Sequence, residues 1–398
     1  MANNNKHTGP NVPALRFPEF SGEWIESKLG DIADFSKGAG ISKDQRSEEG
    51  NPCILYGELY TRYKSEVITN VFSKTALPDS ELVKSKANDI IIPASGETAE
   101  DIATARCVPF DNILLGGDLN IIRLHEQDGK FFSYQLNGVR KYNIATVAQG
   151  VSVVHLHAGD LKGITVKYPS HIAEQEKISQ ILGLIDDRIA TQSKIIEELT
   201  ALRSALLEKV FQVSNPTLEV GAIAHQTSER NKLCRYSNVL SVSNRFGFIN
   251  QSEQFEDRNV ASDDVRNYKV VHRGDFAYNP ARINVGSIAM LKSFESGIVS
   301  PMYICFQVDD TIVDPSFFEL FLETKAFKDE MEIRLEGSVR RCLSFEALCE
   351  IHLPHPALLV QRSISDKIGN ISSKIKLEDR ILRAYIRQKE WLLRQMFI

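Results

Sequence analysis

The chain has 398 residues, of which 42% are hydrophobic, and its formal net charge is -5. This length and composition are typical of a globular protein with two or three domains, and no apolar run reaches the roughly eighteen residues that a membrane-spanning helix needs. A negative net charge argues mildly against nucleic-acid binding, although a local basic face would still allow it.

The N-terminal residues and the cysteines both bear on where the protein works. Residues 1–14 are polar and interrupted by proline, without the apolar core of a signal peptide, so we expect a short disordered arm. The six cysteines lie far apart and form no CxxC pair, which argues against a zinc site or a disulfide framework. We expect buried, free cysteines and a cytoplasmic protein.

The chain contains an internal repeat. The segments from Gln175 to Phe211 and from Gln361 to Phe397 have equal length, at a constant offset of 186 residues. Fainter matches upstream include Gly150 with Gly337, while the middles of the two halves diverge. A shared frame with different contents is what two related modules of different specificity would require.

We expect an α+β fold in which each half is a strand-rich domain followed by a long helix. Short β-branched or aromatic runs such as DIIIP, NIIRL and MYICFQV are separated by Gly, Asn, Asp and Ser clusters, which is typical of strands and turns. The predicted boundaries are a strand-rich domain at 15–168, a helix at 169–212, a second strand-rich domain at 213–356 and a helix at 357–398.

The two predicted helices carry apolar residues at steps of three and four, as in a coiled coil. A helix of about 38 residues would be roughly 55–60 Å long and would leave this stripe in water unless the helices paired. Residues 169–212 hold five Lys/Arg against seven Asp/Glu, and residues 357–398 hold nine against four, so opposite charges favour pairing over two unrelated surface helices. The expected pairing residues are Ile178, Leu182, Ile185, Ile189, Leu206, Ile368, Ile371, Ile375, Leu382 and Leu392.

The sequence lacks the motifs of common active sites. It has no GxxxxGK[ST] phosphate loop, no GxGxxG, no HExxH and no GxSxG. His155 and His157 could share one face of a strand, but no third metal ligand follows at a convincing spacing. Glu323-Thr324-Lys325, with Asp314 upstream, has the residue types of a nuclease core on a segment that looks helical. We therefore expect no catalytic residue and no metal site in this chain.

These features together resemble the specificity subunits of type I restriction-modification enzymes. The resemblance is carried by LRFPEFSGEW from Leu15, the link ITVKYPSHIAEQEKI from Ile164, the repeated helices and YNPARINVGSIA from Tyr278. It covers the chain from Leu15 onward. The second half departs from the pattern, with Gln361-Arg362 in place of Glu174-Gln175, which leaves the geometry of the second helix start open.

The resemblance implies two target-recognition domains held by two antiparallel helices in a pseudo-twofold arrangement. Such a subunit reads a split, asymmetric site on double-stranded DNA and has no active site of its own. Two adenine methyltransferase subunits would hold S-adenosylmethionine, and translocase-nuclease subunits would use ATP and Mg²⁺. This chain itself would bind no cofactor.

The candidate DNA contacts lie on loops between the predicted strands. Arg and Lys suit guanine, Asn and Gln suit adenine, and Ser, Thr and Tyr suit phosphates. In the first module the candidates are Lys37, Ser42, Lys43, Tyr60, Thr61, Arg62, Lys64, Ser95, Thr98, Gln149 and Ser152. In the second module they are Ser228, Arg230, Asn231, Ser243, Asn244, Arg245, Asn279, Arg282, Ser338, Arg340 and Arg341. The PASGET and NPAR loops occupy the same place in the repeat, so we expect them to sit alike on DNA and read different bases.

The charge of each module predicts weak DNA binding by this chain alone. Residues 15–168 carry 17 Lys/Arg against 21 Asp/Glu, and residues 213–356 carry 15 against 20. Tight, salt-dependent binding would then need the methyltransferase partners. Two other functions stay open at this point: a tandem scaffold that binds proteins or peptides, and a standalone Mg²⁺-dependent nuclease.

Overall fold

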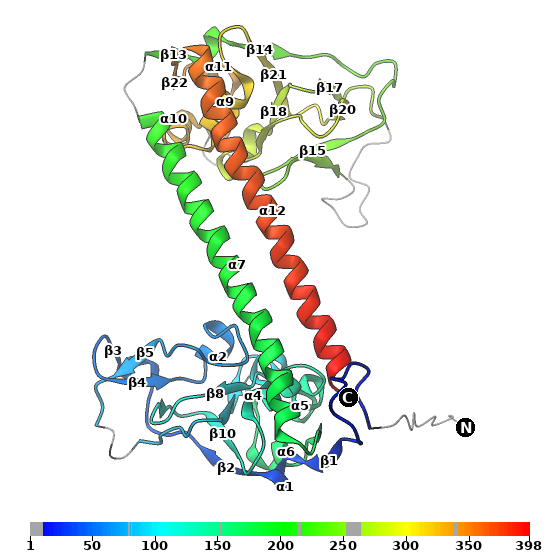
Figure 1. Cartoon of the computed structure of the whole chain (residues 1–398). Helices are drawn as coiled ribbons and strands as arrows, with labels where there is room; N and C mark the ends of the chain where they lie inside the picture. The colour runs from blue at the N-terminus through cyan, green and yellow to red at the C-terminus, as the bar shows by residue number, and fades with distance from the viewer. Residues whose placement is uncertain are drawn as a thin grey trace. The chain divides into compact units, whose positions relative to one another are not determined.

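The computed structural model describes residues 11–78, 80, 82–150, 153–212, 216–251, 264–337 and 341–398. The α+β fold is confirmed: there are two strand-rich regions, each followed by a long helix (Figure 1). Two compact units divide the chain, Met1–Lys194 with Asp379–Ile398 and Ile195–Glu378. Among the described residues, no helix is long and apolar enough to cross a membrane.

The first unit is built on a four-stranded sheet in the order β2-β10-β6-β8, with antiparallel neighbours. Its strands are β1 Ile25–Lys28, β2 Ala33–Lys37, β3 Arg46–Ser47, β4 Asn51–Ile54, β5 Ser73–Thr75, β6 Asp89–Pro93, β7 Ser95–Gly96, β8 Arg106–Val108, β9 Leu114–Leu115, β10 Leu119–Leu124, β11 Val154–His155 and β12 Thr165–Tyr168. Its shorter helices are α1 Leu29–Ile32, η1 Lys43–Gln45, α2 Glu58–Thr61, α3 Ala99–Ile102, α4 Gly129–Asn137, α5 Lys141–Val147 and α6 Ala158–Lys162. The predicted strands DIIIP and NIIRL are β6 and most of β10.

Burial explains why these runs form the centre of the first unit. Every residue of β6 is buried, as expected of a strand covered on both faces. Helix α4 contributes Phe131, Phe132 and Tyr134 to the same core, all fully buried. Such large rings supply much of the apolar area removed from water on folding.

The second unit repeats this sheet as β14-β21-β18-β19, again antiparallel. Its strands are β13 Thr217–Glu219, β14 Ala224–Thr227, β15 Leu240–Ser243, β16 Gly247–Asn250, β17 Lys269–His272, β18 Phe276–Tyr278, β19 Ile288–Met290, β20 Ser296–Val299, β21 Ile304–Val308 and β22 His352–Pro354. Its shorter helices are η3 Val220–Ala222, η4 Pro280–Val285, α9 Pro315–Glu323, α10 Lys325–Arg334 and α11 Phe345–Cys349. Helix α9 buries Phe317, Phe318 and Phe321, matching the aromatic face of α4.

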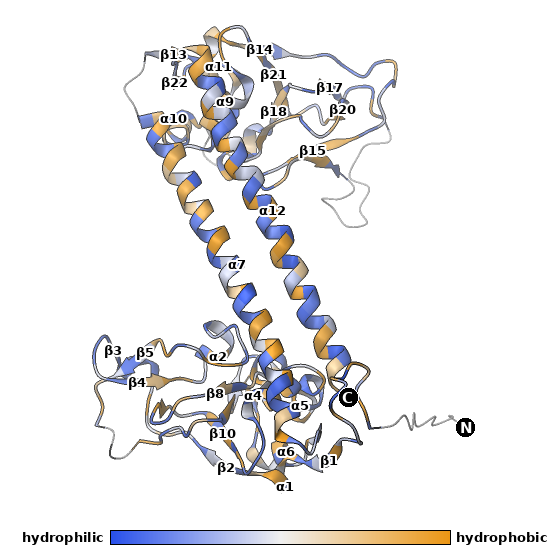
Figure 2. Ribbon diagram, in the orientation of Figure 1, coloured by the Kyte–Doolittle hydropathy of each residue, from blue (hydrophilic) through white to orange (hydrophobic). Residues whose placement is uncertain are grey.

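The two long helices are α7, Ile172–Gln212, and α12, Leu358–Met396. They pack together in opposite directions, because the first unit holds the start of α7 and the end of α12 while the second holds the other two ends. Figure 2 shows apolar residues recurring along both helices among hydrophilic ones. This is the pattern that the spacing predicted.

The predicted pairing residues are buried to different degrees. Five of them are buried, namely Ile178, Leu182, Ile185, Ile368 and Leu392, and four are half-buried, namely Ile189, Ile371, Ile375 and Leu382. Leu206 was wrongly assigned, because it is exposed and its neighbour Leu207 is buried instead. Leu207 and Phe211 are four residues apart and join the core of the second unit, so the end of α7 turns its apolar face toward that domain.

One polar node joins the strand-rich domain to the long helix, and it occurs in both units. In the first unit, Asp128 caps α4 and accepts a hydrogen bond from Ser179 Oγ at 2.6 Å, while its backbone N–H donates to Gln175 Oε1 at 3.0 Å. The amide of Gln175 donates to the Pro169 carbonyl at 2.9 Å. Buried polar groups must be satisfied in this way, so the node fixes the start of α7 against α4.

In the second unit the same node is formed by Asp314, Gln361 and Ser365. Ser365 Oγ donates to Asp314 at 2.6 Å, and the Asp314 N–H donates to Gln361 Oε1 at 2.9 Å. Gln361 Nε2 donates to the Pro356 carbonyl at 2.8 Å. Gln361 therefore takes the place of Gln175, so the expected departure at Gln361-Arg362 was wrong and the geometry of the helix start is preserved.

We expect Asp314→Ala to lower the free energy of unfolding of the second unit by about 2–4 kcal/mol, because it removes a helix cap and leaves Ser365 without its charged acceptor. Denaturant unfolding combined with hydrogen exchange of α9 and α12 measures this loss. Asp309→Ala is a matched control in the same unit, since Asp309 only closes an exposed turn with Thr311. A loss no larger for Asp314→Ala than for Asp309→Ala would contradict the assignment.

The N-terminal segment holds the start of α7 in the first unit. Arg16 forms two hydrogen bonds of 2.8 Å with the buried Glu174 carboxylate, to which Trp24 Nε1 also donates at 3.3 Å. Asn11 accepts from Lys167 Nζ at 2.7 Å, and its carbonyl accepts from the Trp24 N–H. Residues 11–14 were thus wrongly assigned to a disordered arm, and residues 1–10 lie outside the described residues.

The cysteines are less uniform than expected. Cys53, Cys107 and Cys305 are buried, and burial raises the thiol pKa of Cys53 to about 11 and that of Cys305 to about 12. Cys234 is exposed, and Cys342 and Cys349 are intermediate. All six are free, so the expectation of burial holds for three of them.

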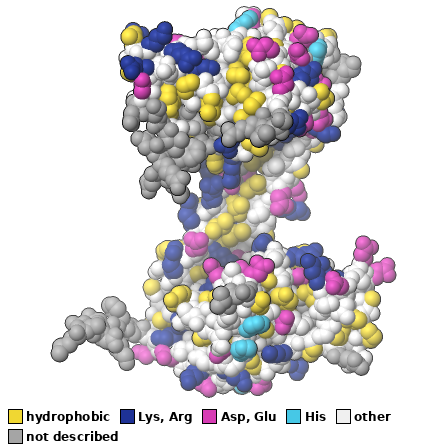
Figure 3. Space-filling view, turned by 180° about the vertical axis from the view of Figure 1, so that it is seen from behind, with side chains coloured by type: hydrophobic (Ala, Val, Ile, Leu, Met, Phe, Trp, Pro, Cys, Tyr) yellow, Lys and Arg dark blue, Asp and Glu magenta, His cyan; other side chains and the backbone are white. Residues whose placement is uncertain are grey.

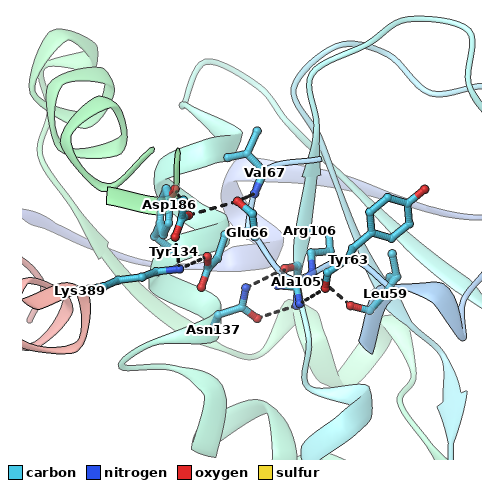
Figure 4. A network of polar contacts seen from close by, with 11 residues as sticks. Leu59, Tyr63, Glu66, Val67, Ala105, Arg106, Tyr134, Asn137, Asp186 and Lys389 are labelled. Atoms are coloured by element: carbon cyan, nitrogen blue, oxygen red, sulfur yellow. Dashed lines mark hydrogen bonds and ion pairs between the residues drawn. The ribbon is translucent and has the colours of Figure 1, made fainter. Parts of the chain in front are cut away.

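A buried ion cluster joins the end of α12 to the strand-rich domain of the first unit (Figure 4). Lys389 Nζ of α12 lies 2.5 Å from Glu66 Oε2 and 2.6 Å from Asp186 Oδ1 of α7. Tyr134 of α4 donates to Asp186 at 2.7 Å. Burial raises the pKa of Glu66, whereas the two carboxylates raise the pKa of Lys389 despite its own burial.

The second unit has a counterpart at the repeat-equivalent position of α7. Arg203 donates to both carboxylate oxygens of Glu323 at 2.8 and 2.9 Å and to Ser372 Oγ at 2.7 Å. Arg203 and Lys389 are 186 residues apart, as are Asp186 and Ser372. In each unit, then, a cation from one long helix binds a residue of the other helix and a carboxylate of the strand-rich domain.

Candidate nucleic-acid interface

Several predicted contacts of the first unit meet at one end of its sheet. Lys37 ends β2 and pairs with Asn120 at the start of β10, while Pro93 at the end of β6 pairs with Leu119. Ser95 follows in β7 and pairs with His155 of β11. The backbone N–H of His155 donates to the Gln149 carbonyl, and the Gln149 N–H donates to the His155 carbonyl. The loops that leave this end of the sheet therefore converge.

Several of these side chains also organise their own loops. Ser42 begins η1 in a capping box with Gln45, and Thr98 caps α3 by accepting from the Asp101 N–H at 3.1 Å. Ser95 is buried, whereas Lys37, Lys43 and Thr98 are exposed. Short capped turns hold exposed side chains in fixed positions, which is what base reading requires.

The α2 region places another group of predicted residues beside the Thr98 loop. Burial raises the pKa of Tyr60, with further contributions from Asp101 and Glu97 of that loop. Thr61 Oγ1 donates to the Gly57 carbonyl at 2.7 Å, and Lys64 Nζ donates to the Thr61 carbonyl at 3.1 Å. The carboxylates near Tyr60 oppose phosphate binding there, so this part of the surface is better suited to base edges.

The second unit presents its loops at the matching end of its sheet. Thr227 at the end of β14 pairs with Cys305, and Tyr278 at the end of β18 pairs with Ile304. Ser228 and Asn279 follow these strands directly, as Gly38 and Ala94 follow β2 and β6. The PASGET and NPAR loops, which are equivalent in the sequence repeat, therefore also follow equivalent strands of the two sheets.

The NPAR loop is a rigid 3-10 turn that exposes one arginine. Asn279 caps η4 by accepting from the Ala281 N–H at 3.1 Å, and Gly286 ends the turn with φ +86°. The Leu343 N–H donates to the Pro280 carbonyl at 3.2 Å. Arg282 is exposed, and its guanidinium has no hydrogen bond or ion pair with any described residue.

The β15–β16 hairpin lies against this loop. Ser243 pairs with Gly247, so Asn244, Arg245 and Phe246 form the tip. The Ser287 hydroxyl donates to the Val242 carbonyl at 3.0 Å, and a Cβ at Gly286 would lie 3.4 Å from that of Asn244. The structure therefore brings the predicted residues Ser243, Asn244 and Arg245 close to the NPAR loop.

The loop after Ser228 contains both a correction and residues that the sequence reasoning missed. Asn231 is buried and exchanges two hydrogen bonds with the Tyr236 backbone, so its amide is occupied inside the protein. Arg230 donates to the Asn267 carbonyl at 2.6 Å. Lys232 and Arg235 stand exposed on the same loop, and a count of basic residues per loop would have found them.

The third pair of predicted loops follows helices in both units. Gly150 has φ +123° and Gly337 has φ +106°, and bridges Gln149–His155 and Glu336–Cys342 close the two turns. Ser152, Ser338 and Arg340 lie outside the described residues. Arg341 is exposed and paired with Glu332, whose backbone carbonyl accepts from Arg341 Nη2 at 2.8 Å.

The residues considered for other chemistry serve the fold. Glu323 binds Arg203, Thr324 caps α10 and Asp314 caps α9. The rings of His155 and His157 are parallel with centroids 6.4 Å apart. Among the described residues, no three His, Cys, Asp or Glu side chains gather as metal ligands would.

Basic and acidic side chains both occur on the face of the molecule that is drawn in Figure 3. Figure 3 shows Lys and Arg interspersed with Asp and Glu over the face that it presents. Many of the basic side chains already form ion pairs with carboxylates. Arg123 pairs with Asp89 at 2.7 Å, and Arg273 pairs with Glu295 at 2.6 Å. Such pairing lowers the basic potential available to phosphates.

Three comparisons agree with this architecture. Residues 21–201 match the family model described as "Type I restriction modification DNA specificity domain". The specificity subunit of the type I restriction enzyme MjaVIII from Methanocaldococcus jannaschii is 23% identical over 92% of this chain and 89% of that protein.

Two solved structures share the fold. An S subunit of a type I restriction-modification system from M. genitalium superposes with a TM-score of 0.64 at 18% identity, over 97% of this chain and 99% of that one. A chain from a study of complex assembly and conformational transition of the type I system gives 0.52 at 13% identity, over 93% and 96%. Residues 21–201 thus match the specificity domain of type I restriction-modification systems, and the whole chain is similar in sequence and in fold to their specificity subunits.

Proposed function

We propose that this chain is the non-catalytic subunit that selects the DNA site of a type I restriction-modification complex and assembles its other subunits. The observation that carries the proposal is the repeat of one frame with different loops. Both units keep the sheet, the Asp-Gln-Ser node and the cation at the long helix, whereas the loops at the matching sheet ends differ in sequence and shape. A frame that is repeated within the chain, with loops that differ, is suited to two domains that bind two different short DNA sequences.

In this proposal each unit reads one half of a split, asymmetric site, and the separation of the halves follows from the protein. One set of loops spans less than a helical turn of DNA, so two units are needed to specify a longer site. The contacts proposed for the first unit are Lys37, Ser42, Lys43, Tyr60, Thr61, Arg62, Lys64, Ser95, Thr98, Gln149 and Ser152. Those proposed for the second are Ser228, Arg230, Ser243, Asn244, Arg245, Asn279, Arg282, Ser338, Arg340 and Arg341, without the buried Asn231.

The proposed partners are two adenine methyltransferase subunits and, in the full complex, translocase-nuclease subunits in the cytoplasm. S-adenosylmethionine, ATP and Mg²⁺ would be held by those partners. Mapping adenine methylation across the host genome tests the proposal. A split, asymmetric motif that disappears when this gene is deleted is the expected result, and an unchanged methylation pattern would refute it.

We expect the isolated chain to bind duplex DNA weakly and the assembled complex to bind it tightly, with affinity falling steeply as salt rises. The reason is the acidic balance of both units and the pairing of many of their cations with carboxylates. Fluorescence anisotropy with one labelled cognate duplex, at two salt concentrations, with and without the methyltransferase, measures this. Tight, sequence-specific binding by the chain alone would contradict the prediction.

A further inference from the structure

Each unit carries an exposed phenylalanine with an arginine stacked on its ring, and we propose that each pair reads a thymine and a neighbouring guanine in the DNA major groove. The pairs are Arg62–Phe72 in the first unit and Arg245–Phe246 in the second. This inference rests on the proposed function and extends it to two residues, Phe72 and Phe246, that carry apolar contacts with bases.

The pair in the second unit stands at the tip of the β15–β16 hairpin. Phe246 is 67% exposed, and the Arg245 guanidinium carbon lies 5.2 Å from the centre of its ring. Ser243 Oγ accepts from the backbone N–H groups of both residues, at 3.3 and 3.4 Å, and Gly247 closes the turn with φ +67°. The tip is therefore ordered before any ligand arrives.

The pair in the first unit is held more firmly. Phe72 is 49% exposed, the Arg62 guanidinium carbon lies 4.5 Å from the centre of its ring, and the Tyr63 ring packs against it at 5.5 Å between centroids. Arg62 Nη1 lies 3.6 Å from the buried carboxylate of Glu58. Glu58 in turn accepts from Ser73 Oγ, at 2.5 Å, which fixes the stack to β5.

The position of the two pairs links them to specificity. No other arginine lies over a phenylalanine ring among the described residues. In sequence, the first pair falls between β2 and β6 and the second between β14 and β18, which are the first two strands of each main sheet. That interval is where the two halves of the chain diverge. A single exposed apolar residue needs no explanation, but the same preformed pair in both variable regions does.

The chemistry of the pair matches two adjacent bases. A guanidinium held over an aromatic ring keeps N–H groups free, and these can bond the O6 and N7 acceptors of guanine. The ring edge offers an apolar contact to the C5-methyl group of thymine, which only the major groove presents. A two-stranded ribbon such as β15–β16 fits that groove.

The test uses the assembled complex and a duplex with its recognised site, in which each thymine is replaced in turn by deoxyuridine. We expect the wild type to lose about fourfold in affinity at one thymine of each half-site, the factor that one buried methyl group supplies. Phe246→Ala should lose this sensitivity in one half-site and Phe72→Ala in the other. Phe246→Leu should keep it, and Phe110→Ala, an exposed phenylalanine without a stacked arginine among the described residues, should change neither.

Two outcomes would overturn the inference. One is retention of the wild-type response to deoxyuridine by both alanine variants, provided that their thermal unfolding is normal. The other is a wild-type complex that binds its site tightly but ignores every thymine methyl group. A wild-type complex without any sequence preference would instead overturn the proposed function itself.

Discussion

Replacement of Lys389 by methionine should lower the free energy of unfolding of the first unit by about 3–5 kcal/mol, because removal of one partner strands a buried opposite charge. Lys389 faces two carboxylates, Glu66 and Asp186, whose side chains are 11% and 9% exposed. Methionine fills a similar volume but removes the ion pairs of both acids, which then keep only the electrostatic attraction of the buried Arg106. Denaturant unfolding monitored by hydrogen exchange in α4 and α12 measures the loss.

The deficit of this variant should depend on pH. Lys389 has a raised pKa, so its stabilisation is fully present at neutral pH and is lost only as pH rises through that pKa. Glu66 also has a raised pKa, so the folded state binds its proton more tightly than the unfolded state does. This contribution to stability is lost as pH rises through the folded-state pKa. Without Lys389, protonation of Glu66 relieves the repulsion, and the difference from wild type should therefore be smaller at pH 5 than at pH 8.

Two further variants separate this cluster from an ordinary surface pair. Arg383→Met breaks an exposed pair with Asp379 on the same helix and should cost at most about 0.5 kcal/mol. The double variant Lys389→Met, Glu66→Gln should recover part of the stability, because it removes one of the two uncompensated charges. Equal losses for Lys389→Met and Arg383→Met would show that water reaches the cluster and screens it.

Much of the fold could be predicted because its strands and helices have periodic apolar patterns and because the sequence repeats. The fully buried strand β6 has the unbroken apolar run of DIIIP, and the long helices have steps of three and four. The repeat also placed the PASGET and NPAR loops at matching positions, as the two sheets have them. These patterns are all visible within the sequence itself, so one sequence is enough to detect them.

The polar interior could not be predicted in the same way. Glu66 and Lys389 are 323 residues apart, and nothing in either neighbourhood marks them as partners. Leu206 and Leu207 both fit an apolar stripe, and only the domain at the end of α7 decides that Leu207 is buried. A charge or a borderline apolar residue acquires its role from tertiary packing, which local spacing does not encode.

The candidate contacts show the same limit. Asn231 and Arg230 are neighbours on one polar loop, yet Asn231 is buried in a turn and Arg230 lies on the surface. Ser42, Thr98 and Asn279 are favoured at helix starts as well as at DNA, and all three do begin short helices. Residue type therefore selected candidate loops but could not separate loop-forming side chains from free ones.

Arg282 is the free side chain of the NPAR loop, and Arg282→Ala should weaken binding of the cognate duplex by the assembled complex by about 10–100-fold, the usual worth of an arginine–guanine contact. The turn that carries it is fixed by the Asn279 cap, by Gly286 and by the bond from Leu343 to Pro280. The backbone of the turn therefore loses little entropy on binding, and the ordering cost is confined to the arginine side chain. Competition with duplexes mutated in one half-site at a time should assign the effect to a single half.

A conservative variant distinguishes base reading from phosphate binding at this position. Lysine keeps the charge but loses the planar fork, so Arg282→Lys should remain well below wild type if the side chain reads guanine. If it contacts phosphate, Arg282→Lys should bind almost as wild type, and Arg282→Ala should weaken all sequences alike. Arg273→Ala is the matched control, because Arg273 is exposed in the same unit, is already paired with Glu295 and is not among the proposed contacts. Normal, half-site-specific binding by Arg282→Ala would exclude the NPAR loop from the recognition surface.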